Sequence, residues 1–216
     1  MLRWLIFRRK SHDGLVTSMR GERDLALGGV PAAGAAFGGA YNPEYVPGMV
    51  NQFDFYDGGG LDVCFLGAAE VDRMGNCNVS KFTRTVGPGG FINIASNTPK
   101  CVFCGTLTAG GLKTEVRDGK LVILQEGRNK KYVSHVKQIT FSGENAVKSG
   151  QDVLFITERA VFKLDGEGII LTEIAPGIDL QTQVLDVIDF PVRVSPELKL
   201  MDERIFREGK MGLTLE

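Results

Sequence analysis

Short apolar runs, bounded by glycine, proline or polar residues, recur along most of this chain. Residues 61–67 and 101–105 are almost wholly apolar, which is typical of strands covered on both faces of a parallel sheet. Three further strands are predicted at residues 152–156, 160–164 and 168–174. Strands that alternate along the chain with connecting segments of a different hydrophobic period predict an α/β fold.

A short helix and a hairpin are predicted between these strands. Residues 91–96 follow two glycines and open the helix. Residues 114–125 alternate around Asp118-Gly119, a dipeptide that favours the tight turn of a β-hairpin.

A second helix is predicted near the carboxyl end of the chain. Asp179 is placed to cap it, and it runs to about residue 188 with one apolar face. That face consists of Leu180, Val184, Leu185 and Ile188. Pro191 and Pro196 predict an irregular segment after the helix.

Two glycine runs are the most distinctive feature of the sequence: Gly58-Gly59-Gly60 and Gly87-Pro88-Gly89-Gly90-Phe91. Without a Cβ in the way, a ligand oxygen can approach the backbone N–H groups closely. At strand ends such groups hold phosphates or a developing oxyanion. Tight turns explain any single glycine equally well, and neither run is a dinucleotide or P-loop fingerprint. We expect residues 87–91 to line the deepest cleft, with amides that the fold does not all use.

Composition is that of an ordinary folded domain. Hydrophobic residues make up 43% and charged residues 24% of 216 residues, which predicts one domain with a normal core. The net charge of −1 gives no reason to expect nucleic acid as a partner. No apolar run reaches the roughly 18 residues of a membrane-spanning helix, so we expect a cytoplasmic protein.

The first 27 residues are predicted to be a basic tail, and residues 28–216 the domain. In the tail an apolar start precedes Arg8-Arg9-Lys10, the reverse of a secretory signal. An organelle transit peptide is an alternative, and a solvated tail is favoured.

The four cysteines are expected to be reduced and inert. Cys101 and Cys104 have the spacing of a redox or zinc motif, but no second such pair exists. Both fall in a predicted buried strand, where positions three apart face opposite sides. We therefore expect buried thiols and no metal site.

Longer blocks of the sequence carry a family resemblance. In chain order they are QFDFYDGGGLD at 52–62, LGAAEVD at 66–72, GNCNVSKF at 75–82, GGFINI at 89–94, TERAVF at 157–162 and TEIAPGID at 172–179. From about residue 28 to residue 206, this order and spacing resemble the carboxyl-terminal half of class I coenzyme A (CoA) transferases. The resemblance is to the fused acetate/propionate enzymes in particular.

The resemblance implies an open three-layer α/β/α sandwich with a mostly parallel sheet and a hairpin insertion. It also implies transfer of CoA from a short-chain acyl-CoA to a free carboxylate. A glutamate attacks the acyl-CoA and becomes a thioester itself. CoA is then a substrate, and no permanently bound cofactor is expected.

The resemblance also assigns residues. The Gly90 amide occupies the oxyanion position, and Gly87, Gly89 and Phe91 shape its loop. The run Gly58, Gly59 and Gly60 is implied to lie against the pantetheine of CoA or against neighbouring backbone. Lys81 either approaches a phosphate or is an ordinary exposed lysine.

The implied partners are an amino-terminal half or α-type subunit and further copies of the chain, since the family's site lies between two similar domains. No nucleic acid or membrane partner is implied. Ketone-body and short-chain fatty-acid metabolism are the implied setting. Phe53, Phe55, Tyr56 and Phe91 fit either a surface facing the second domain or the core.

The nucleophile is where the sequence departs from the family. Counting back from Gly28-Gly29-Val30-Pro31, the expected glutamate position is Arg23, which cannot form a thioester. Glu22 would serve after a one-residue slip, and the reading as a tail glutamate is favoured.

Two functions follow. One is a CoA-transferase half, inactive as an isolated chain. The other is a non-catalytic remnant that keeps the fold. A sugar-phosphate isomerase relative is a third reading, without an evident acid/base set.

Overall fold

The computed structural model describes residues 30–31, 40–82, 87–208 and 211. The chain divides into two compact units, Met1–Cys64 with Pro88–Lys100 and Phe65–Gly87 with Cys101–Glu216. The expected nucleophile region, with Glu22, Arg23, Gly28 and Gly29, lies outside the described residues.

The first unit is built around two short helices. They are α1 (Met49–Asp57) and α2 (Phe91–Ser96), and a small antiparallel pair joins β1 (Val30–Pro31) to β2 (Ala40–Tyr41). Asn93 on α2 donates to the Asp57 carboxylate at 3.0 and 3.2 Å, and Asn97 donates to the Asp57 carbonyl at 2.8 Å. These bonds tie the two helices together at the end of α1.

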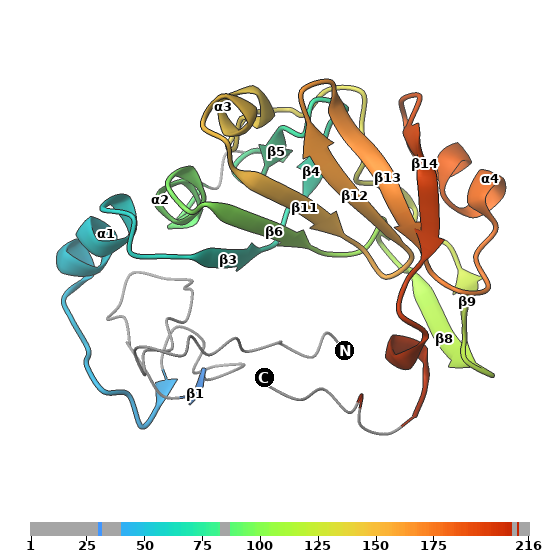
Figure 1. The fold of residues 1–216 in the computed structure, drawn as a ribbon, viewed down its shortest axis with the longest axis horizontal. Helices are drawn as coiled ribbons and strands as arrows, with labels where there is room; N and C mark the ends of the chain where they lie inside the picture. The colour runs from blue at the N-terminus through green and yellow to red at the C-terminus, as the bar shows by residue number, and fades with distance from the viewer. Residues whose placement is uncertain (1–29, 32–39, 83–86, 209–210, 212–216) are drawn as a thin grey trace. The chain divides into compact units, whose positions relative to one another are not determined.

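The main sheet has six strands in the order β14-β13-β12-β11-β6-β3. Their bounds are β3 (Val63–Leu66), β6 (Lys100–Cys104), β11 (Asp152–Ile156), β12 (Ala160–Asp165), β13 (Gly168–Ile174) and β14 (Arg193–Leu200). β3, β6 and β11 run in the same direction (Figure 1), and β13 and β14 are parallel. β11, β12 and β13 form an antiparallel meander. The predicted α/β class with a mostly parallel sheet is confirmed, and the meander makes the sheet mixed.

The smaller elements lie in the second unit. They are β4 (Glu70–Val71), β5 (Cys77–Asn78), β7 (Thr108–Ala109), β8 (Lys113–Arg117), β9 (Lys120–Gln125), β10 (Asn129–Lys130), α3 (Gly143–Lys148), α4 (Leu180–Gln183) and 3₁₀ turns at Leu185–Val187 and Glu203–Phe206. The β8–β9 hairpin is confirmed, and it turns through Asp118 and Gly119 at φ 51° and 73°.

Aromatic rings fill the core of the second unit. Phe103 stacks on Phe155 at 5.3 Å between ring centroids and meets Phe141 edge-on at 4.9 Å. Phe155 and Phe162 have no exposed surface. The alternating strands therefore place their apolar faces as the sequence predicts.

Two predictions about the carboxyl end are wrong. The helix capped by Asp179 ends at Gln183, not near residue 188, because Val184 leaves helical geometry at φ −124°. The Gln183 carbonyl is taken by the buried Arg159 guanidinium at 3.0 Å. Pro196 lies inside β14, where the pairing register with β13 shifts, an interruption that tolerates a residue without an N–H.

None of the four cysteines forms a disulfide; Cys64, Cys77 and Cys101 are buried and Cys104 is half-buried. Burial raises the pKa of the Cys77 thiol well above its usual range. Among the described residues, no group of His, Cys, Asp and Glu side chains is placed to hold a metal ion. Within the same ranges, no helix has the length and apolarity needed to cross a membrane.

Candidate functional site

The loop before α2 contains the half-buried Gly90. Gly90 precedes the helix at φ −78°, and Gly87 and Gly89 adopt the left-handed region at φ 81° and 57°. The Phe91 N–H donates to the Pro88 carbonyl at 3.3 Å. Among the described residues, the Gly90 N–H donates no hydrogen bond. This amide is therefore available to an incoming oxygen.

The absence of a side chain at position 90 also has a packing reason. A Cβ there would lie 3.1 Å from Cε1 and Cζ of Phe53 on α1. Phe53 is half-buried and meets Tyr56 edge-on at 5.8 Å. A side chain at position 90 therefore presses first on Phe53, which has to shift by a few tenths of an ångström to admit a Cβ.

Gly58, Gly59 and Gly60 close the end of α1. Their N–H groups donate to the carbonyls of Asp54, Tyr56 and Phe55 at 2.8, 3.1 and 2.9 Å. A Cβ at Gly60 would overlap the Phe55 ring. All three amides are used by the helix end, which leaves none to hold a phosphate.

Lys81 is exposed, and its backbone is fixed by the buried Asn78. The Asn78 Oδ1 accepts from the Lys81 N–H at 3.0 Å, and its amide group donates to the Lys81 carbonyl at 2.6 Å and to Glu70 at 2.7 Å. The lysine therefore extends from a rigid turn. Of the predicted aromatic set, Tyr56 and Phe91 are buried, Phe53 is half-buried and Phe55 is exposed.

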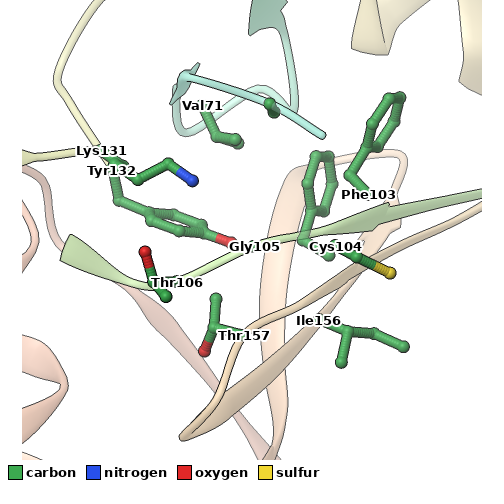
Figure 2. A pocket seen from close by; sticks show the side chains of 11 residues that line it. Val71, Phe103, Cys104, Gly105, Thr106, Lys131, Tyr132, Ile156 and Thr157 are labelled. Atoms are coloured by element: carbon green, nitrogen blue, oxygen red, sulfur yellow. The ribbon is translucent and has the colours of Figure 1, made fainter. Parts of the chain in front are cut away.

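A cavity of about 10 Å³ opens in the second unit, where β6 and β11 end (Figure 2). Cys104, Gly105 and Thr106 come from the end of β6, and Ile156 and Thr157 from the end of β11. The carboxyl ends of parallel strands are where α/β sheets bind ligands. The volume is room for about one water-sized group.

Lys131 and Tyr132 form the polar side of this cavity. Lys131 is half-buried, and Tyr132 is only 4% exposed. Figure 2 shows both side chains on the Gly105 side of the cavity, with the tyrosine hydroxyl directed toward Gly105. Burial lowers the pKa of Lys131, and attraction to Glu158 opposes that shift. The sequence analysis missed this pair, because no motif marks it.

A buried guanidinium braces the loops beside the cavity. Arg159 has no exposed side-chain surface and donates to both Glu126 oxygens at 2.7 and 2.9 Å and to Glu158 at 2.6 Å. The second Glu158 oxygen accepts from the Leu107 N–H at 2.9 Å. Hydrogen bonding to Arg159 lowers the pKa of Glu126 to about 2. For Arg159, the only signal in the sequence is its position in the TERAVF block at 157–162.

The chain is similar to CoA-transferases over most of its length. It is 55% identical over 190 residues to the acetate CoA-transferase YdiF of Escherichia coli K12, covering 88% of this chain and 36% of that protein. It is 50% identical over 193 residues to the caffeate CoA-transferase of Acetobacterium woodii, covering 87% of this chain and 37% of that protein. No family model matches the chain.

Solved structures agree with the sequence comparison. The apoenzyme of YdiF from Escherichia coli O157:H7 superposes with a TM-score of 0.83 at 53% identity, over 88% of this chain and 36% of that one. A thioester complex of YdiF with CoA superposes with a TM-score of 0.82. Glutaconate CoA-transferase from Acidaminococcus fermentans superposes with a TM-score of 0.61 at 16% identity, over 82% of this chain and 70% of that one. It therefore shares the fold.

The predicted resemblance is thus confirmed, and the chain spans little more than a third of the length of the CoA-transferases that it matches. The chain is therefore a homologue of the CoA-transferases over 88% of its own length, and it corresponds to a carboxyl-terminal part of them.

Proposed function

We propose that this chain supplies one side of a CoA-transferase site and moves CoA between a short-chain acyl-CoA and a free carboxylate. The observation that carries the proposal is the 55% identity to an acetate CoA-transferase over 190 residues. The relatives are much longer, so the remaining part of the site comes from an amino-terminal half or a separate subunit.

The chemistry proceeds through a glutamyl-CoA thioester. A glutamate oxygen attacks the thioester carbonyl, the CoA thiolate leaves, and a mixed anhydride forms. The thiolate then attacks the glutamyl carbonyl and releases the acyl group as a free acid. A second carboxylate reverses both steps. Each tetrahedral oxyanion needs N–H donors.

The Gly90 amide is the proposed donor to that oxyanion. Its support is that the amide has no other acceptor among the described residues and that Gly90 is not fully buried. Gly87, Gly89 and Phe91 hold the loop around it. Lys81, on its fixed turn, is the proposed contact to a CoA phosphate. The N–H groups of Gly58, Gly59 and Gly60 all donate to carbonyls of α1. We therefore assign these glycines to packing of the helix end.

A chimera tests the function directly. Residues 28–216 replace the corresponding segment of Escherichia coli YdiF, which keeps every YdiF residue outside that segment. We expect CoA transfer from acetyl-CoA to propionate, measured by chromatography of the CoA esters. A folded chimera that binds acetyl-CoA without turnover would favour the non-catalytic remnant instead.

A further inference from the structure

The cavity at the ends of β6 and β11 holds a cation without a bonded partner. Among the described residues, Lys131 Nζ makes no hydrogen bond and no ion pair. The Tyr132 hydroxyl likewise has no hydrogen-bond partner there, although the residue is only 4% exposed. Within the described ranges, the fold therefore uses neither of these two donors.

The position of the amine is built into the backbone. The Val71 N–H donates to the Lys131 carbonyl at 2.8 Å, and the Val133 N–H donates to the Val71 carbonyl at 2.9 Å. These two bonds fix the segment that carries Lys131 and Tyr132 against β4. A Cβ at Gly105 would lie 2.7 Å from Lys131 Nζ. Glycine at 105 therefore leaves the room in which the amine lies.

The other polar groups around the cavity are already occupied. The Thr106 hydroxyl donates to the Thr108 carbonyl at 2.6 Å, and the Thr157 hydroxyl donates to the Ala160 carbonyl at 2.9 Å. Both Glu158 oxygens are engaged, by Arg159 and by the Leu107 N–H. Glu158 therefore attracts Lys131 without bonding to it.

We propose that Lys131 Nζ and the Tyr132 hydroxyl bind one carboxylate head of a small organic acid at the carboxyl ends of β6 and β11. An ammonium and a hydroxyl are both donors, and a single carboxylate oxygen can accept a hydrogen bond from each of them. The cavity of about 10 Å³ admits one oxygen, and the rest of the acid stays at the mouth. This concerns binding alone and stands whether or not transferase activity is found.

The binding depends on pH through the ammonium. Lys131 faces Glu158, Cys77, Cys104 and Tyr132, and burial lowers its pKa from the usual lysine range. The carboxylate binds the protonated amine, so affinity falls as pH rises through that lowered pKa. An exposed lysine would lose its charge only at higher pH.

Calorimetric titration of the 216-residue chain with acetate tests the site, with acetamide as the neutral analogue and chloride as the simple anion. We expect saturable acetate binding with a dissociation constant on the order of 10 mM. Acetamide should not bind because it carries no charge, and chloride should bind more weakly because it is larger than the single oxygen that the cavity admits. Lys131→Met should weaken acetate binding at least about tenfold and Tyr132→Phe less, since a bond to a charged group is the stronger one.

Two further variants separate the site from folding and from nonspecific charge. Gly105→Ala keeps the lysine but displaces its amine, and it should also weaken binding. Lys113→Met, which removes an exposed lysine of the β8–β9 hairpin, should leave acetate binding unchanged. Acetate binding that is unaltered by Lys131→Met or Gly105→Ala, or absent in the parent chain up to about 100 mM, would overturn the proposal.

Discussion

Arg159 has no exposed side-chain surface, and it joins its own loop after β11 to two segments that are distant in sequence. Its guanidinium bonds Glu126 after β9, Glu158 after β11 and the Gln183 carbonyl at the end of α4. Planar, forked donors suit such a bidentate pairing, which a lysine cannot reproduce. Removing one partner of a buried ion pair leaves the other charge uncompensated.

Arg159→Met should therefore lower the free energy of unfolding by about 3–5 kcal/mol. Urea unfolding followed by circular dichroism measures this loss. Arg117→Met is the matched control, because Arg117 pairs with Glu115 on the exposed hairpin at 2.9 Å, and it should cost at most about 1 kcal/mol. Equal effects of the two changes would show that Arg159 does not brace the loops.

Glu126 makes the stability depend on pH. Its pKa is about 2 in the folded protein and near its ordinary value when unfolded, so the unfolded state binds the proton more readily. Its contribution is present in full above about pH 5 and is lost as pH falls toward 2. The difference in urea midpoint between the parent and Glu126→Gln should be constant from pH 7 to 5 and shrink below. A difference that grows on acidification would contradict the assignment.

At the scale of elements, local patterns predicted most of the structure. α2, β11 and β13 have the expected bounds, and the hairpin turns at Asp118-Gly119. Helix α4 is shorter than its apolar face suggests, because Arg159 takes the Gln183 carbonyl and that contact is invisible in local sequence. The Lys131 cavity was missed for the same reason, since β4, β6 and β11 meet only through tertiary packing.

The hairpin turn gives a prediction at this scale. Gly119 sits at φ 73° with nothing within 4 Å of an added Cβ, so Gly119→Ala is strained by conformation alone. We expect a loss of about 1 kcal/mol. Gly166→Ala is the control, since it has equal space and no positive φ, and it should be neutral or slightly stabilising. Thermal unfolding of both variants decides whether the turn geometry is correct.

At the scale of the whole molecule, the chain matches 36% of the length of YdiF. The sequence predicted the family from blocks that span both units. The nucleophile stays a prediction, because Glu22 and Arg23 lie outside the described residues. The division between the two units falls in the chain between Gly87 and Pro88, shortly before Gly90.

The isolated 216-residue chain should show no CoA-transferase turnover. A route through a glutamyl thioester needs a glutamate at the reacting carbonyl, and Arg23 stands at the expected position. Incubation with acetyl-CoA and short carboxylates, followed by mass spectrometry of the intact protein, should show no CoA adduct. An adduct mapped to Glu22 would make that residue the nucleophile, and an adduct elsewhere would indicate different chemistry.

The most direct test concerns the Gly90 amide in the active YdiF chimera. Gly90→Pro removes the N–H, and the φ of −78° is one that proline adopts. Gly90→Ala adds a comparable Cβ beside Phe53 but keeps the N–H, so the ratio of the two kcat values isolates the donor. We expect the proline variant to be slower than the alanine variant by about 10²–10³-fold, the cost of one lost oxyanion donor. Equal kcat values in two folded variants would contradict the account.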